Sequence, residues 1–280
     1  YLRGRFRSRS VDDVLYEARL LAHNGVKELI VVAQDTSRYG TDLTGGKRLL
    51  PQLLRELCRI DGFEWIRIHY VYPDEIDDEL IEVIASEPKI VKYLDIPIQH
   101  CNDRILKLMN RRGDNAFLQE LFGKLRSKVP GIVLRTSVIT GLPGEGDEEF
   151  RELCDFLKKM RLERVGAFPF SPEEGTPAAE MEHIDFEVAI QRAQMVESIQ
   201  SQIMDEYNAA MIGKTLRVLV DGYDEDFEQF YGRTFADSPE IDGRVWIASD
   251  EALVEGRFVN VCVDGLIDGE LSGYIVEEQI

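Results

Sequence analysis

Polar residues stand directly after five short apolar runs of this sequence, where they could bind and orient a charged small molecule. They occupy residues 33–40, 69–74, 95–100, 141–145 and 168–177. Each segment alone could be an ordinary loop; in 141–145, for example, Gly144 suits a left-handed turn and Glu145 suits a helix start. Five such segments that follow strands of one sheet favour a shared site over coincidence.

A charged residue also stands inside one of the apolar runs. Arg135 lies in the run 132–139, and a guanidinium in a buried strand must pair with an acid or meet a ligand carboxylate. His100 alone would more often be a structural histidine than a catalyst. Arg135 therefore indicates a ligand site more strongly than His100 does.

Strands and helices alternate between Ser10 and residue 185. Ser10 predicts a helix N-cap, with Asp13 as a variant of the capping box. Apolar periodicity predicts strands at 27–33, 64–70, 90–96, 132–139 and 164–170. The first of these reads as buried on both faces. Helices are predicted at 11–21, 49–60, 76–86, 105–109, 116–128 and 147–160.

This alternation predicts an α/β fold with a parallel sheet and helices packed outside it. Five strands are visible and the first element is a helix, so a strand before Tyr1 would make six. We therefore expect a partial, open parallel β/α barrel rather than a closed one of eight strands. In such barrels the chemistry lies at the carboxyl ends of the strands.

The sequence pattern changes after residue 185. Residues 186–211 predict one long helix, and short β-rich runs follow at 216–220, 229–235, 245–247, 258–263 and 273–276. Short strands with turn residues between them are typical of a small antiparallel β-barrel. The expected division is a barrel domain at 1–185, a connector helix at 186–213 and a small β domain at 214–280.

Charge restricts the partners of the chain. The formal net charge is −19, which repels nucleic-acid phosphates unless basic residues gather in one patch. Residues 214–280 hold five basic and sixteen acidic residues, a net charge of −11. A basic protein is the expected partner of this region, and nucleic acid is not. An acidic surface also serves solubility and alone names no partner.

The four cysteines are scattered, with no CxxC pair among them. This pattern predicts a reducing, cytoplasmic setting. Cys58 and Cys154 fall within helical patterns and read as small buried hydrophobic residues. No apolar run is long enough to span a membrane, and no signal peptide is recognisable.

Taken together, the polar segments resemble the methylthiotransferase branch of the radical S-adenosylmethionine (SAM) enzymes over nearly the whole chain. The motifs that carry the resemblance are Arg7-Ser-Arg9, Ala33-Gln-Asp-Thr36 with Tyr39-Gly40, Asp95-Ile-Pro97 with Gln99-His100, Leu134-Arg-Thr136, Gly141-Leu-Pro-Gly-Glu145, and Phe170-Ser171 leading to Glu174-Gly-Thr176. The β-rich tail resembles a TRAM domain. Residues 33–36, 173–176 and 238–243 look most similar to the RimO type, which modifies an aspartate of small-subunit ribosomal protein twelve.

The resemblance implies two 4Fe–4S clusters and SAM as cofactors. Family members hold one cluster with a CxxxCxxC motif, generate a 5′-deoxyadenosyl radical from SAM and insert a methylthio group at an unactivated carbon. This sequence contains no such motif. The cluster cysteines are therefore expected upstream of Tyr1, no metal ligand is expected in this chain, and the chain alone is expected to be inactive. Asn102 also departs from the family pattern, which has Ser there.

Carried over by position, the resemblance implies three groups of site residues and no catalytic residue in this chain. Arg135 is expected to pair with the SAM carboxylate. The other SAM-binding residues are expected to be Gln34, Asp35, Ser137, Gly141, Pro143, Gly144, Glu145, Phe168 and Ser171. Tyr39, Tyr72, Gln99 and His100 are expected on the substrate side. Arg7 and Arg9 are expected beside the cluster, where their charge would favour it; a solvated basic loop is the alternative reading.

Two other functions remain open. A tRNA adenosine methylthiotransferase would share the chemistry, although the acidic tail argues against it. A cluster-free domain that only binds a basic protein is the second alternative. Such a binding domain would not require polar residues at the ends of its strands, which argues against this alternative.

Overall fold

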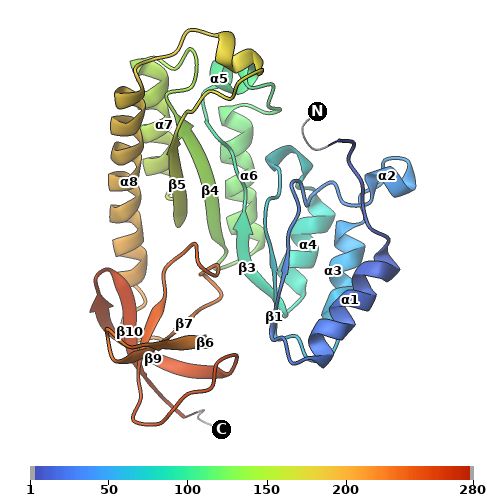
Figure 1. Ribbon diagram of the computed structural model, residues 1–280, viewed down its shortest axis with the longest axis vertical. Helices are drawn as coiled ribbons and strands as arrows, with labels where there is room; N and C mark the ends of the chain where they lie inside the picture. Colours follow the sequence, from blue (N-terminus) through green and yellow to red (C-terminus); the bar gives the residue numbers. More distant parts are fainter. Residues whose placement is uncertain (1–3, 278–280) are drawn as a thin grey trace. The chain divides into compact units, whose positions relative to one another are not determined.

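The computed structural model describes residues 4–277 of the chain (Figure 1). Contacts divide it into two compact units, Tyr1–Ser201 and Gln202–Ile280. The division falls inside helix α8 (Phe186–Ala209), which covers most of the connector predicted at 186–213.

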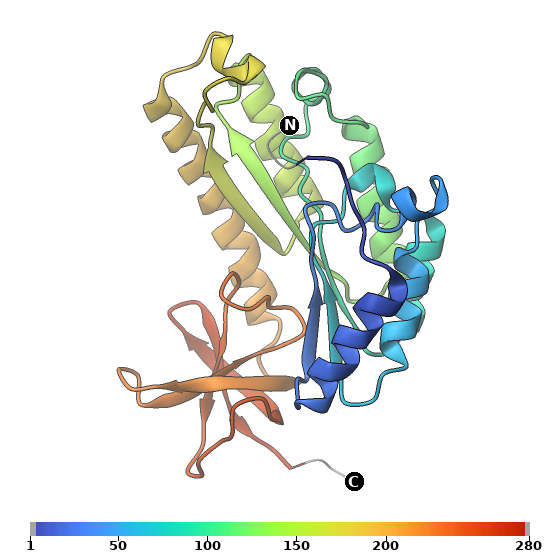
Figure 2. The ribbon, with the colours of Figure 1, turned by 45° about the vertical axis from the view of Figure 1, so that its right-hand side comes forward.

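The first unit is built on a five-stranded parallel sheet with strands in sequence order (Figure 2). Its strands are β1 (Glu28–Val31), β2 (Trp65–Ile68), β3 (Ile90–Asp95), β4 (Val133–Thr140) and β5 (Arg164–Pro169). Among the described residues β1 and β5 do not pair with each other, so the sheet stays open. The prediction of a partial, open parallel barrel is confirmed.

Helices connect the strands and cover one face of the sheet (Figures 1 and 2). They are α1 (Val11–His23), α2 (Thr41–Thr44), α3 (Leu50–Cys58), α4 (Asp78–Ser86), α5 (Asp103–Leu108), α6 (Asn115–Lys128) and α7 (Asp147–Met160), with short 3₁₀ turns η1 (Pro73–Glu75) and η2 (Pro177–Glu180). Ser10 caps α1 as predicted, since its side chain accepts a hydrogen bond from the Asp13 amide. The return bond of a capping box is replaced, because the Asp13 carboxylate accepts from Arg9 instead.

The predicted burial of the first strand was wrong. Every residue of β1 is only half-buried, and Val32 just after it is 58% exposed. Within the described chain β1 pairs with β2 alone, so it is an edge strand. An apolar run indicates that a strand can be buried, but it does not reveal how many neighbours the strand has.

The second unit contains a closed barrel in the order β10-β8-β7-β6-β9. Its strands are β6 (Thr215–Asp224), β7 (Gln229–Arg233), β8 (Val245–Ala248), β9 (Phe258–Ile267) and β10 (Glu270–Ile275). The prediction of a small barrel is confirmed, but β8 and β10 run parallel rather than antiparallel. A ring of five strands cannot alternate in direction all the way round, so at least one pair must be parallel.

A tight hairpin joins β9 to β10. Ile267 pairs with Glu270, and the two residues between them both have positive φ, 50° at Asp268 and 84° at Gly269. This is the backbone of a type I′ turn, whose twist matches that of the flanking strands. The barrel interior is aliphatic and consists of Val218, Val220, Val245, Ile247, Val261, Val263 and Leu271.

Over residues 4–277, none of the helices combines the length and the apolar character that a membrane crossing requires.

Candidate functional site

The sheet of the first unit carries ionic and aromatic side chains on one face. Strand register places Arg67, Tyr93, Asp95 and Arg135 on this face. Glu28 accepts a hydrogen bond of 2.8 Å from Arg67 Nε, and the Arg67 guanidinium lies 4.6 Å from the centre of the Tyr93 ring. We call this row of side chains the polar sheet face. Buried charges of this kind must be paired to be tolerated.

The opposite face of the same strands is mainly apolar, with Lys92 of β3 and the buried Thr136 and Thr140 of β4 as its polar members. Its residues include Ile66, Ile68, Leu94, Leu134 and Val138, none of them more than 1% exposed. The alternation is clearest in β4, where Arg135, Ser137 and Ile139 are half-buried and the residues between them are fully buried. The sheet therefore separates its packing surface from a surface that can do chemistry.

Arg135 meets an acid of the same protein. Its Nη1 donates a 3.0 Å hydrogen bond to Asp95 Oδ1 on the neighbouring strand. The sequence left two outcomes open for this arginine, an acid partner or a ligand carboxylate, and the structure shows the first. Its expected contact with the SAM carboxylate stays a prediction, and such a ligand would share Arg135 with Asp95.

His69 extends the polar sheet face toward the strand ends. Its ring stacks on Tyr93 with 6.0 Å between the ring centres. Burial lowers the pKa of His69 below its ordinary value, although the nearby Asp95 carboxylate opposes the effect. His69 is thus favoured as a neutral ring near neutral pH.

A pocket of about 520 Å³ lies at the carboxyl ends of β1 and β2, and we call it the strand-end pocket. It brings together three of the predicted residues, Gln34, Asp35 and Tyr72. Ser37 fixes this corner, because its hydroxyl donates to Asp35 and accepts from the Tyr72 amide at 3.1 Å. The other lining residues are Arg38, Pro73, Asp74, Glu75, Ile98, Leu106, Asn110, Arg111, Arg112 and Leu118.

The loop 141–145 is held from inside by Glu145. Glu145 Oε1 accepts from the Gly141 amide at 3.0 Å and from Arg192 Nη1 of α8 at 2.8 Å. Gly141 has φ of 76°, and a Cβ there would lie 2.4 Å from the Cβ of Ala189. The Glu145 side chain is completely buried, so it braces the loop from inside.

His100 lies inside the protein, and its expected place on the substrate side stays a prediction. Its side chain is 0% exposed. Nδ1 accepts a hydrogen bond of 3.0 Å from the Asn102 amide, and Nε2 lies 3.4 Å from Glu145 Oε2. The chain turns inward here because Gln99 adopts a left-handed φ of 69° while it bridges to Val138 of β4. Gln99 itself is half-exposed.

Asn102, the departure from the family pattern, has a structural role. Its Oδ1 accepts from the amides of Arg104 and Ile105 and so caps α5. A serine would fill the same capping position.

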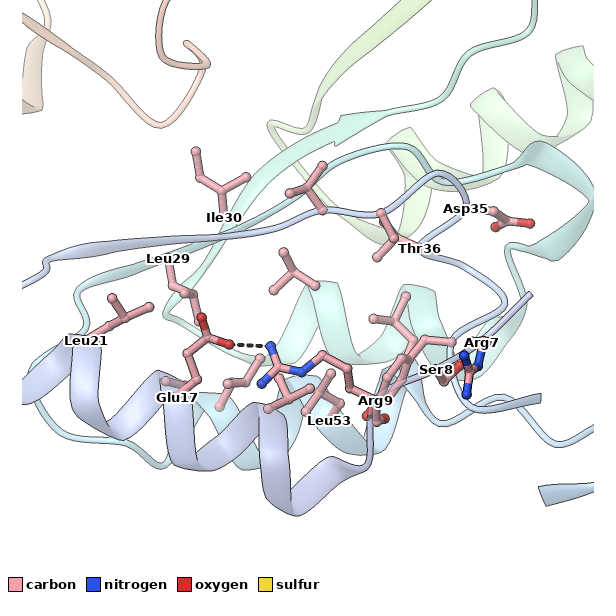
Figure 3. Close-up of a pocket in the computed structure, with 18 of the residues that line it drawn as sticks. Arg7, Ser8, Arg9, Glu17, Leu21, Leu29, Ile30, Asp35, Thr36 and Leu53 are labelled. Carbon is pink, nitrogen blue, oxygen red and sulfur yellow. Dashed lines mark hydrogen bonds and ion pairs between the residues drawn. The ribbon is translucent and has the colours of Figure 1, made fainter. Parts of the chain in front are cut away.

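A second pocket, of about 420 Å³, runs beside β1 between α1 and α3 (Figure 3). Its lining combines the apolar residues Leu21, Leu29, Ile30 and Leu53 with the predicted residues Arg7, Arg9, Asp35 and Tyr39. Arg9 reaches along it toward Glu17, with which it pairs, and it also bonds Asp13 at 2.6 Å. These two hydrogen bonds raise the pKa of Arg9. Two acids of α1 therefore already balance the charge that was expected to favour a cluster.

The remaining predicted residues lie apart from these pockets. Pro143, Gly144 and Glu145 line a third pocket of about 420 Å³ with Leu108, His183 and neighbouring residues. Phe168 is 53% exposed on β5 and Ser171 follows in an exposed loop. Neither they nor Arg135, Ser137 and Gly141 line any of the three pockets. The predicted site residues are thus distributed over the strands and the loops that follow them, and they do not share one pocket.

The described residues do not fit an iron–sulfur cluster. In residues 4–277 no group of three or more potential metal ligands lies together. Cys58, Cys101 and Cys154 are buried, and burial raises the pKa of each thiol, that of Cys58 to about 12. Cluster ligands are thiolates, and these environments disfavour a thiolate.

Sequence reasoning missed three arginines that organise the site: Arg67, Arg111 and Arg192. Arg67 could have been found, because it stands in the apolar run 64–70 just as Arg135 stands in the next strand but one. Arg192 and Arg111 lie in a helix and a loop, where an arginine is unremarkable until the fold shows what surrounds it.

The profile of the radical SAM superfamily matches residues 1–157, and that of the TRAM domain matches residues 212–276. The chain is 47% identical over 279 residues to ribosomal protein uS12 methylthiotransferase RimO of Acetivibrio thermocellus, covering 99% of this chain and 61% of that protein. It is 48% identical over 277 residues to the protein of the same name from Anaeromyxobacter sp. (strain Fw109-5), covering 98% and 58%.

Among solved structures, coproporphyrinogen III oxidase from Escherichia coli aligns with a TM-score of 0.49 and 18% identity, over 69% of this chain and 46% of that one. The chain thus spans about three fifths of the length of the curated relatives that it matches.

Proposed function

Since this chain belongs to the radical SAM superfamily, we propose that it is the SAM-binding and substrate-binding part of a methylthiotransferase that modifies an aspartate of ribosomal protein uS12. The observation that carries the proposal is the 47% identity that continues through both units. A likeness confined to the first unit would support radical SAM chemistry and leave the substrate open.

The size and chemistry of the strand-end pocket support the binding of SAM there. Sites for ligands of this size commonly enclose about 300–1,000 Å³, and this pocket encloses about 520 Å³ with carboxylate, amide and guanidinium groups on its walls. In this superfamily SAM supplies the group that removes hydrogen from an unactivated carbon. Asp35 is positioned for an ammonium group, because Ser37 and the Arg38 amide fix Oδ1, while Oδ2 lies 4.0 Å from Arg38 Nε, too far for a hydrogen bond.

The cluster does not fit the described residues, so its ligands must come from elsewhere. We propose that they belong to the part of the longer relatives that this chain does not cover. The residues described here would then orient SAM and substrate but would not start the reaction.

The second unit is the proposed contact for the substrate protein. Its net charge of −11 over residues 214–280 suits a basic ribosomal protein and repels RNA. This assignment implies a cytoplasmic protein.

The test is a mass measurement on purified uS12. It is incubated anaerobically with SAM, a reductant and either this chain or the longer protein that contains it with reconstituted clusters. We expect the longer protein to add the mass of one methylthio group in place of one hydrogen, and this chain alone to add nothing. The uS12 variant with Asn at the modified aspartate is the control. Modification of tRNA instead of uS12, or transfer by this chain alone, would contradict the proposal.

A further inference from the structure

Arg111 differs from four other arginines of the first unit that are largely withdrawn from water. Arg67, Arg126, Arg135 and Arg192 each have a carboxylate oxygen within 3.0 Å. Within residues 4–277, no carboxylate lies within 4.0 Å of the Arg111 guanidinium, although the side chain is half-buried in the strand-end pocket. A cation removed from water without a counter-ion is costly for a fold to keep.

The contacts of Arg111 hold it in place but do not neutralise it. Nη1 donates to the Pro97 carbonyl at 3.0 Å, and the guanidinium lies 5.1 Å from the centre of the Tyr72 ring. The Pro97 carbonyl and the Tyr72 hydroxyl engage two of the five N–H donors, and the others remain available. Burial lowers the pKa of Arg111, with Tyr72 and Asp74 opposing the effect.

The acids of the pocket are already engaged with other arginines. Asp35 lies 4.0 Å from Arg38, Asp74 lies 3.7 Å from Arg112, and Glu75 lies 3.5 Å from Arg48. Asp74 acts on Arg111 only from beyond 4.0 Å, so no acid of the described pocket forms an ion pair with Arg111. The acids of the pocket also oppose a doubly charged anion such as phosphate, so a single negative charge suits the pocket better.

The apolar floor of the pocket strengthens such a contact. Ile98, Leu106 and Leu118 are each no more than 3% exposed. An ion pair above an apolar surface is attenuated less by water than one on an open face. A guanidinium fork matches the two oxygens of a carboxylate.

We propose that Arg111 binds the carboxylate of a ligand in the strand-end pocket. Two ligands of the proposed function could supply that group, the side chain of the substrate aspartate or the amino-acid end of SAM. The choice between them rests on the proposed function. The carboxylate site itself does not.

The experiment measures affinities of the full 280-residue chain by NMR titration. The probes are N-acetyl-L-aspartate N-methylamide with its asparagine analogue, and SAM with decarboxylated SAM. Arg111→Gln is compared with Arg59→Gln, which removes the same charge from an exposed position on the far end of α3. Arg111→Lys keeps the charge but loses the fork, and circular dichroism checks that all variants are folded.

We expect Arg111→Gln to weaken one carboxylate ligand at least tenfold, with Arg111→Lys in between and Arg59→Gln unchanged. A loss for blocked aspartate but not for its asparagine analogue identifies the substrate as the source. A loss for SAM but not for decarboxylated SAM identifies SAM. The proposal is overturned if the unaltered chain binds neither carboxylate ligand, or if Arg111→Gln and Arg59→Gln bind them equally well.

These results are independent of the uS12 assay. If uS12 stays unmodified by the longer protein while Arg111→Gln still loses a carboxylate ligand, the proposed function fails and the Arg111 site stands. If uS12 is modified and Arg111→Gln binds both carboxylate ligands normally, the proposed function stands and the Arg111 site fails.

Discussion

The polar sheet face of the first unit and the interior of the barrel in the second bury different chemistry. The polar sheet face buries Arg67 with Glu28 and Asp95 with Arg135. The barrel core consists of seven aliphatic residues and no charged one. Aliphatic burial stabilises a fold in proportion to area, whereas a buried ion pair can cost more in desolvation than it returns. The first unit therefore keeps an arrangement that is poor for stability but suited to orienting a polar ligand.

Removal of the buried carboxylate of Glu145 tests this contrast most strongly. Glu145→Ala leaves the Gly141 amide without its acceptor and takes from the buried Arg192 its nearest buried counter-charge, so we expect a loss of about 3–5 kcal/mol in the free energy of unfolding. Urea denaturation followed by circular dichroism measures it. The side chain of Asp147, the second acidic partner of Arg192, is 90% exposed. Asp147→Ala should therefore cost less than about 1 kcal/mol. Equal losses of unfolding free energy in the two variants would show that the burial of a carboxylate does not determine how much its removal destabilises the protein.

A glycine pair separates crowding from backbone strain in the first unit. Gly141 and Gly131 share a φ of 76°, but only at Gly141 would a Cβ meet a neighbour, the Cβ of Ala189 at 2.4 Å. Gly131→Ala should cost about 1 kcal/mol through φ alone, and Gly141→Ala about 2–3 kcal/mol, because Ala189 must also move. Both are measured by urea denaturation. Similar values would mean that α8 yields to the added methyl group.

The barrel should show the mildest response to a small change. Ile247→Val removes one methylene from a fully buried position in β8, and we expect a loss of about 0.5–1.5 kcal/mol. Because no ionisable group belongs to this core, the loss should be the same at pH 6 and pH 8. Urea denaturation at the two pH values checks this. A pH-dependent loss would mean that the barrel depends on titrating groups as the sheet does.

The sequence predicted where the strands and helices lie better than it predicted which strands pair with each other. Within residues 4–277, apolar periodicity located each of the ten strands and the long helices, because burial of one face leaves a local signal. It could not show that β1 is an edge strand or that β8 and β10 are parallel, since pairing is decided between segments far apart in the chain. The four-residue helix α2 was also missed, because it is too short to show a period.

The same limit applies to the candidate site. Residue types at strand ends predicted Gln34, Asp35 and Tyr72, which the structure brings to one pocket. They did not predict that His100 turns inward, because this depends on the left-handed Gln99 and on Glu145 from another loop. Arg111 was not predicted, because only the folded structure shows which side chains surround it and that no carboxylate of the described residues pairs with it.

The tight turn at Asp268–Gly269 has a consequence for the order of folding. The β9–β10 hairpin needs only neighbouring residues, and hairpins form in about 1–10 μs. The parallel pair of β8 and β10 joins segments with the whole of β9 between them, and such non-local pairing is slower. We infer that the hairpin forms early and that β8 closes the ring late. Changes in the turn should then act on the folding rate, and changes in β8 on the unfolding rate.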